Sequence, residues 1–236
     1  MKKSILFLAF LACSFIVNAQ KIKGNGNMTT ITRSTSDYDG IKCAGSFDYI
    51  LVAGTEGNIT IEGEENLLEY IVTEVKGGNL IVKTENNVNL RTSKGKTIKI
   101  TIPFKDINNV SLAGSGDLWN EDKITSTNLD VALAGSGDVV LNVEASSIVG
   151  KLAGSGDLTL KGNTNELEAK VSGSGDFHGF NLQSNHTNVA VAGSGDAEVV
   201  SNISLKARVA GSGDIEYRGN PKTEDTKVAG SGSISN

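Results

Sequence analysis

The residues with the clearest capacity for chemistry are six aspartates that recur along the C-terminal half of the chain. Each closes a Gly-Ser-Gly-Asp tetrapeptide, and successive copies are separated by 21, 19, 19, 20 and 18 residues. The six are Asp117, Asp138, Asp157, Asp176, Asp196 and Asp214. If the repeats stack, the carboxylates form a row. Such a row could hold a hard cation, or place two carboxylates a few ångströms apart at a glycosidic bond.

A stacked row of like charges needs a source of stabilisation. Neighbouring strands of a sheet lie about 4.8 Å apart, so each carboxylate would have a like charge about 5 Å away. The row must be solvated, accept hydrogen bonds from backbone N–H groups, or be neutralised by cations. We expect the backbone hydrogen bonds, because aspartate commonly accepts N–H groups of its own or an adjacent turn. Bound calcium is the alternative, and we expect no other cofactor and no dedicated metal site.

The tetrapeptide also predicts a sharp corner that recurs with a nearly constant period. Glycine reaches positive φ without a Cβ clash, so two glycines around a serine allow an abrupt bend. A period near 20 residues is typical of a solenoid in which each repeat forms one coil. The last copy ends in serine instead of aspartate. The first glycines of the copies, which we expect to form the structural turns, are Gly114, Gly135, Gly154, Gly173, Gly193, Gly211 and Gly230.

Apolar residues alternate with polar ones on both sides of each corner, as in Leu129, Val131 and Leu133 before one corner and Val139 and Leu141 after it. A spacing of two is strand periodicity. Two short strands that meet at the corner and close through a polar stretch would make one coil.

The sequence therefore predicts an all-β fold, a right-handed parallel β-helix. About seven regular coils of 19–21 residues would occupy residues 105–236, and a less regular β region residues 20–104. We expect the polar closing stretches at residues 144–147 and 162–166. No linker separates the two parts, so we expect residues 20–236 to form a single domain.

The less regular region contains further strand patterns. Alternation around residues 47–51, 59–61 and 98–102 predicts strands, and residues 73–82 read as a hairpin with a glycine pair in its turn. Residues 66–71 are the one plausible short helix.

The segment Ala44–Asp48 resembles a degenerate copy of the corner. In that register Cys43 takes the position that is aliphatic in every regular coil. This position favours a buried, unreactive thiol over a redox cysteine.

Residues 1–19 have the pattern of a secretory signal peptide. Lys2 and Lys3 precede the apolar stretch 5–17, and a small-residue cleavage site ends at Ala19. The stretch is too short for a membrane span, and we expect no transmembrane segment in the mature chain. Lipidation at Cys13 is an alternative mode of processing. Either route predicts an exported protein, located in the periplasm, at the outer membrane or outside the cell.

Several residues interrupt the repeat and are candidates for binding. Trp119, the single tryptophan, follows the first regular corner and is either an exposed platform for a sugar or a partly buried cap over the coil face. His178 and His186 could form a metal or acid–base pair, but no third ligand is near in sequence, which favours solvated loop residues.

Three later residues, Lys206, Arg208 and Tyr217, are expected to contact acidic residues of neighbouring coils.

The formal net charge of −5 and the lack of a basic patch argue against a nucleic-acid partner. The sequence contains no nucleophile elbow, phosphate-binding loop, HExxH or CxxC motif.

Five features together resemble the head GIN domain family over residues 22–236. They are the Gly24–Gly26 opening, the segment Gly45–Tyr49, the Gly77–Val82 hairpin, the strand Ile98–Pro103 and the repeated Gly-Ser-Gly-Asp. The family comprises exported proteins of Bacteroidetes bacteria that are often labelled autotransporter adhesins. The resemblance implies a parallel β-helix-like fold and carries no catalytic or binding residues to this chain.

We therefore expect a non-enzymatic binding or structural protein of the cell envelope, whose partner is a glycan or an envelope protein. Trp119 and the aspartate row are the expected binding residues. The alternative is a carbohydrate-active enzyme that uses the row, although enzymes usually break their repeat where chemistry occurs. The final coil, with Val228 and Ile234, could also support end-to-end self-association.

Overall fold

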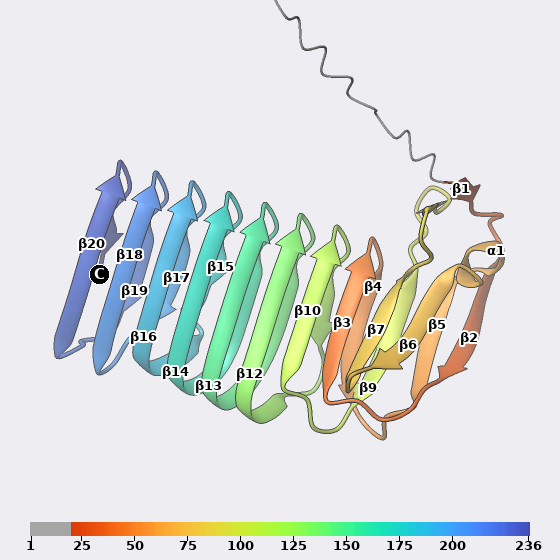
Figure 1. The fold of residues 1–236 in the computed structure, drawn as a ribbon, viewed down its shortest axis with the longest axis horizontal. Coiled ribbons are helices and arrows are strands. Elements are labelled where there is room, and N and C mark those ends of the chain that lie inside the picture. The colour runs from red at the N-terminus through yellow and green to blue at the C-terminus, as the bar shows by residue number, and fades with distance from the viewer. Residues whose placement is uncertain (1–19) are drawn as a thin grey trace, which may run out of the picture.

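The alternating residues form parallel strands that stack into an elongated solenoid (Figure 1). The computed structural model describes residues 20–236, so the expected signal peptide and Cys13 lie outside the described residues. The chain rises along one face, turns at the glycine corner and descends along the other, which gives a right-handed winding. The predicted all-β, right-handed parallel β-helix is confirmed.

The regular coils pair in register, so that each corner glycine lies opposite its counterpart in the next coil. Their strands are β10 (Asn109–Gly114), β11 (Leu118–Asn120), β12 (Ile124–Gly135), β13 (Val139–Gly154), β14 (Leu158–Gly173), β15 (Phe177–His178), β16 (Leu182–Gly193), β17 (Ala197–Val200), β18 (Ser204–Gly211), β19 (Ile215–Arg218), β20 (Thr223–Gly230) and β21 (Ile234–Ser235).

Backbone packs directly on backbone at the corners. The carbonyl of Gly135 accepts N–H groups from both Ser155 (2.8 Å) and Gly156 (3.1 Å) of the next coil. Gly154 has φ +135°, and a Cβ on it would lie 2.1 Å from the oxygen of Gly135. A Cβ on Gly156 would lie 1.9 Å from the oxygen of Gly137. Both glycines of the motif are therefore required for coils to approach at strand spacing.

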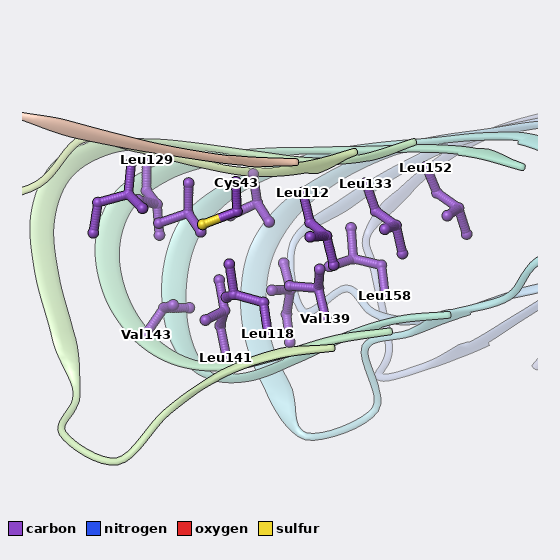
Figure 2. Packing of buried hydrophobic residues seen from close by; sticks show 14 of the residues in the cluster. Cys43, Leu112, Leu118, Leu129, Leu133, Val139, Leu141, Val143, Leu152 and Leu158 are labelled. Carbon is purple, nitrogen blue, oxygen red and sulfur yellow. The ribbon is translucent and has the colours of Figure 1, made fainter. Parts of the chain in front are cut away.

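The core lies between the two faces of each coil (Figure 2). Leu112, Leu133 and Leu152 come from strands that precede corners, whereas Leu118 and Val139 come from strands that follow them. All five are 2% exposed or less. Burial of such a side chain contributes about 1.5–3 kcal/mol. Each coil covers the open end of its neighbour, so the core is continuous along the stack.

The predicted closing stretches at 144–147 and 162–166 are not loops. They lie within β13 and β14, each a continuous strand of 16 residues that bends and stays paired with its neighbours. Hydroxyl groups at the bends bond to the carbonyl two residues on: Thr164 Oγ1 donates to Glu166 O (2.9 Å) and Ser184 Oγ to His186 O (3.1 Å). These bonds satisfy buried polar groups where the strand changes direction, so the polar residues can remain in the hydrogen-bonded strand.

The N-terminal region consists of short strands and one helical turn. Its elements are β1 (Gln20–Lys23), β2 (Met28–Ser34), β3 (Gly40–Gly45), β4 (Asp48–Ala53), β5 (Asn58–Glu64), α1 (Glu65–Leu68), β6 (Ile71–Lys76), β7 (Asn79–Thr84), β8 (Val88–Arg91) and β9 (Lys99–Phe104). The predicted hairpin is confirmed as the antiparallel pair β6–β7. The predicted helix is too long at its C-terminal end, because Ile71 is buried as the first residue of β6. Within residues 20–236, no helix is long and apolar enough to span a membrane.

Strands β3 and β4 form a coil of the regular stack, although β10 follows them only after residues 54–108. They pair in parallel with β10 and β11, and Gly45 lies opposite Gly114. Cys43 lies opposite Leu112 and is buried, as predicted. Burial raises the pKa of the Cys43 thiol well above its usual value, which makes the thiol unreactive. Strands β7 and β9 stack on the other side of this coil, and β2, β5 and β6 add antiparallel pairs to that end.

A buried carboxylate joins the segments of this N-terminal cap. Glu64 accepts hydrogen bonds from Ser93 Oγ (2.7 Å), Ser93 N (2.8 Å) and Gly26 N (2.5 Å). The bond from the Ser93 hydroxyl, followed by the bond from its backbone, holds the pKa of Glu64 below its usual range. The ionised form is therefore favoured in the folded state.

We predict that Glu64→Gln reduces stability most at neutral pH. A lowered folded-state pKa gives stability that is present above the unfolded-state pKa and is lost as the pH falls through the folded-state pKa. Thermal unfolding from about pH 7 to about pH 3 should show the difference between variant and parent protein shrinking as the pH falls. Glu62→Gln, at an exposed position two residues away, is the control. A difference that stays constant with pH would contradict the prediction.

We predict that Gly154→Ala lowers the free energy of unfolding by about 2 kcal/mol or more, because its Cβ meets a backbone oxygen that cannot move aside. Gly77→Ala is the matched control: Gly77 also has positive φ, at +57°, but a Cβ there would have no atom within 4 Å. The control should lose about 1 kcal/mol. Urea denaturation measures both, and equal losses would show that close stacking is not the reason for glycine.

Candidate functional site

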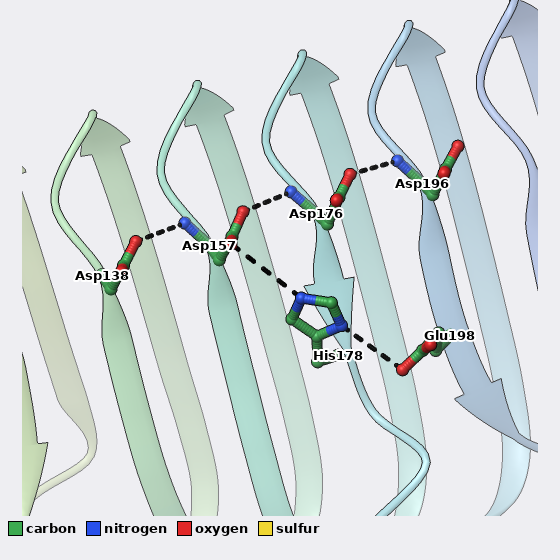
Figure 3. A network of polar contacts seen from close by, with 6 residues as sticks. All are labelled: Asp138, Asp157, Asp176, His178, Asp196 and Glu198. Atoms are coloured by element: carbon green, nitrogen blue, oxygen red, sulfur yellow. Dashed lines mark hydrogen bonds and ion pairs between the residues drawn. The ribbon is translucent and has the colours of Figure 1, made fainter.

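The aspartates form a ladder along the edge that follows the corners (Figure 3). We call the six predicted residues, from Asp117 to Asp214, the aspartate ladder. In the first five, Oδ1 accepts the backbone N–H of the aspartate in the following coil, at 2.7–3.1 Å. The last member, Asp214, accepts both N–H (2.6 Å) and Oγ–H (2.9 Å) of Ser233 instead. The predicted capping by an adjacent turn is confirmed.

These hydrogen bonds offset the repulsion between stacked carboxylates. Bonds to a charged acceptor contribute about 1.5–3 kcal/mol each, whereas exposed like charges are screened by solvent and salt. Asp117, Asp138, Asp196 and Asp214 are exposed to solvent. Because one oxygen of every carboxylate is held by backbone, the second oxygen is presented in the same way from coil to coil. Calcium binding by the row stays the untested alternative.

A column of outward-facing residues runs beside the ladder, two positions after each aspartate and after Ser233, which replaces aspartate in the last copy. In the strand register these residues lie opposite one another, and we call them the flanking column: Trp119, Val140, Thr159, His178, Glu198, Glu216 and Ser235. Unlike the ladder, the column changes from coil to coil. It is apolar at Trp119 and Val140 and carries an imidazole and two carboxylates at His178, Glu198 and Glu216, so it supplies chemical variety that the repeat lacks.

Trp119 lies at the apolar end of this column and is half-buried. Together with the ladder residues Asp117 and Asp138 and with Asn142 and Lys161, it lines an open pocket of about 460 Å³. The structure thus brings the predicted tryptophan and two predicted aspartates together. The remaining four aspartates lie farther along the same edge.

His178 is the centre of a second cluster, three coils after the one that contains Trp119. Its Nδ1 lies 3.3 Å from Glu198 Oε2, and its Nε2 lies 4.0 Å from Asp157 Oδ2 (Figure 3). One ligand atom from each of Asp157, Asp176 and His178 lies within 4.8 Å of the other two, and all three residues are half-buried. Sequence reasoning did not find these partners because it looked for them nearby in the chain. A separation of one period, as between His178 and Glu198, is the signal that would have found them.

The alternative in which His178 pairs with His186, which the sequence did not favour, is wrong. His186 lies in β16, where its Nδ1 is 2.8 Å from Ser204 Oγ. Its partners in the strand register are Glu166 and Ser204. Neither histidine is a solvated loop residue, because both belong to strands and are half-buried. The neighbours of a side chain in a strand are the residues at the same position of the adjacent coils. Two histidines eight residues apart therefore have different surroundings.

The contacts with acidic residues that the sequence predicts for Arg208 and Tyr217 are present in the later coils. Arg208 forms an ion pair with Asp225, and Tyr217 donates its hydroxyl to Glu224 at 3.2 Å. The hydrogen bond from Arg208 lowers the pKa of Asp225. Arg218 adds a contact that the sequence did not suggest, with its guanidinium carbon 3.7 Å from the centre of the Phe180 ring.

Comparison with known proteins agrees with this architecture. Residues 37–221 match the family described as "Putative auto-transporter adhesin, head GIN domain". The chain belongs to this family. The resemblance inferred from the corner motif, the hairpin and the strand at 98–103 is therefore confirmed, and the head GIN protein is adhesin-like by family. No match was found among curated proteins.

Solved structures show the same fold as this head GIN protein. One, described as a putative adhesin from Bacteroides fragilis, has 25% sequence identity and a TM-score of 0.83, and the similarity covers 91% of this chain and 99% of the other. A "putative lipid binding protein" from Parabacteroides distasonis has 28% identity and a TM-score of 0.75, over 92% and 99% of the two chains. A putative adhesin from Parabacteroides distasonis has 26% identity and a TM-score of 0.72, with the same coverage.

The ladder predicts different effects for two substitutions of Asp138. Asp138→Ala leaves the N–H of Asp157 without its acceptor and should lower the free energy of unfolding by about 1–2 kcal/mol. Asp138→Asn keeps an acceptor oxygen and removes a like charge from the row, so its effect should stay within about 0.5 kcal/mol. Urea denaturation of both variants tests this, and equal losses would contradict a capping role.

Proposed function

We propose that this adhesin-like protein is exported to the cell envelope, where it binds a glycan without catalysing a reaction. The binding face would consist of the aspartate ladder and the flanking column. The observation that carries this proposal is the half-buried Trp119 beside Asp117 and Asp138 in an open pocket. An indole ring offers a flat apolar surface to the C–H face of a sugar, and carboxylates accept hydrogen bonds from its hydroxyl groups.

The solenoid supports recognition of an extended ligand. The ladder repeats the same carboxylate about every 4.8 Å along a rigid stack, so one face presents many equivalent hydrogen-bond acceptors in a line. A polysaccharide chain can contact several of them at once, and Lys161 and Asn142 add donors near Trp119. The pocket is open to solvent, which suits a segment of a chain better than an enclosed small molecule.

A carbohydrate-active enzyme is the second candidate, and carboxylate spacing is the observation in its favour. Neighbouring ladder carboxylates follow the strand spacing of about 4.8 Å, close to the separation of about 5–5.5 Å between the two carboxylates of retaining glycosidases. Against it, each ladder carboxylate uses one oxygen to cap the next coil, and the repeat makes the exposed pairs alike. Catalysis requires two carboxylates with different environments.

A glycan array combined with a polysaccharide depolymerisation screen tests the proposal. We expect retention of the parent protein on at least one glycan class and no release of product. Trp119→Ala should weaken retention about tenfold, because it removes a stacking surface worth about 1 kcal/mol or more. Product release without retention would support the enzyme instead.

Asp214→Asn is the matched control, since it changes a ladder residue far from Trp119 and keeps an acceptor for Ser233. It should affect retention less than Trp119→Ala does. Lipid vesicles belong in the same screen, because one structural relative carries the name of a lipid-binding protein. Binding to vesicles but to no glycan, or equal effects of the two substitutions, would contradict the proposal.

A further inference from the structure

We propose that Asp157, Asp176 and His178 bind a divalent transition metal, for which Zn²⁺ is the test ion. This inference does not depend on glycan binding. The three residues offer two carboxylate oxygens and one imidazole nitrogen, and the ligand atoms lie within 4.8 Å of one another. Tetrahedral Zn²⁺ holds such ligands at about 2.0–2.2 Å, which places the ligand atoms about 3.4 Å from one another. Binding would therefore require side-chain rotations that bring the ligand atoms closer together than the 4.8 Å limit seen here.

Glu198 supplies an independent reason to place a metal here. Its Oε2 lies 3.3 Å from Nδ1 of His178, on the side of the ring away from Asp157. Metal-binding histidines commonly donate one ring N–H to a carboxylate, which fixes the tautomer and directs the other nitrogen to the metal. With the proton on Nδ1, the lone pair of Nε2 faces the carboxylate of Asp157 at 4.0 Å. Two electron-rich atoms at that distance are stabilised by a cation between them.

The aspartate ladder orients the carboxylates that would complete the site. Oδ1 of Asp157 accepts the N–H of Asp176 at 3.0 Å, and Oδ1 of Asp176 accepts the N–H of Asp196 at 2.7 Å. Each carboxylate is thereby fixed through one oxygen and presents the other. A set of ligands that is already oriented loses little side-chain entropy when an ion binds.

The identity of the flanking column restricts the site to one place in the stack, where Asp157 of one coil meets Asp176 and His178 of the next. The corresponding positions in other coils carry Trp119, Val140, Thr159, Glu216 and Ser235, none of which offers an imidazole beside the ladder. Imidazole favours zinc and similar metals, whereas calcium takes oxygen ligands. A preference for Zn²⁺ over Ca²⁺ thus distinguishes this site from general cation binding along the row.

Three protein ligands leave at least one coordination position open to solvent. The position faces outward on the same face as Trp119, about 14 Å away across three strand spacings. A bound metal would therefore add a Lewis-acidic contact to that face, able to accept a carboxylate or hydroxyl oxygen from outside the protein.

Calorimetric titration of the tag-free, EDTA-treated protein with ZnCl₂ tests the inference. We expect one saturable site with a dissociation constant in the micromolar range and no corresponding heat with CaCl₂. His178→Gln and Asp157→Asn should each weaken binding at least tenfold, and Glu198→Gln should weaken it by about tenfold or more through loss of the orienting carboxylate. Thermal melting without metal verifies that each variant is folded.

His186→Gln and Asp214→Asn are the matched controls, a histidine and a ladder aspartate outside the cluster, and both should bind Zn²⁺ like the parent protein. Replacement of Zn²⁺ by Co²⁺ adds a spectroscopic readout, since visible absorption bands should appear in the parent and the controls and be lost in His178→Gln. No saturable heat with ZnCl₂, or unchanged affinity in His178→Gln, would overturn the inference. Equal loss in His186→Gln would also overturn it.

Discussion

The structure depends on the close approach of backbone to backbone at the glycine corners. A Cβ at Gly135, Gly154 or Gly193 would lie 2.0–2.2 Å from the carbonyl oxygen of the preceding corner. Absence of that atom allows each carbonyl to accept two N–H groups from the next coil, which holds the coils in register. The apolar layers inside and the carboxylates outside are aligned because the corners are aligned. Burial of leucine and valine supplies most of the stability, but the corners determine which residues meet.

The register of the coils determines which residues are neighbours in space. Residues one repeat apart become neighbours at strand spacing, whereas residues a few positions apart can face different surroundings. Each aspartate therefore accepts the backbone N–H of the corresponding residue in the next coil. In the same way, His178 lies beside Asp157 of the preceding coil and Glu198 of the following one. The corner motif itself is chemically uniform, and the flanking column beside it changes from coil to coil. The repeated corners hold the backbone in a constant arrangement, and the changing side chains of the flanking column can give different parts of the surface different binding properties.

The sequence was sufficient to predict the features that repeat. The period near 20, the alternation around each corner and the position of Cys43 predicted the stack, the core and the buried thiol. The sequence was insufficient where polar residues, which locally suggest a loop, belong to strands that pair with neighbouring coils. The polar stretches at 144–147 and 162–166 look like loops, yet they are paired strands, because neighbouring coils satisfy their backbone groups.

Two other features lay beyond local reasoning. The degenerate corner at Ala44–Asp48 indicates that residues 40–53 form a coil, but it does not indicate that the next coil of the stack begins at residue 109, after the 54–108 segment. The partners of His178 are likewise distant in the chain, and a search along the chain instead of across the period could not find them. In both cases the missing information is register, which becomes explicit only when the coils are aligned corner on corner.

The most direct test of corner-on-corner stacking is a set of pulsed electron paramagnetic resonance distances between spin labels on the corner serines. With one label on Ser115 and the second on Ser174, Ser194 or Ser231, the pairs are separated by three, four and six coils. The account predicts that the distance rises linearly by about 4.8 Å per coil, to roughly 29 Å for the longest pair. Distances that do not increase with coil number would contradict the stacked register on which the ladder and the binding face depend.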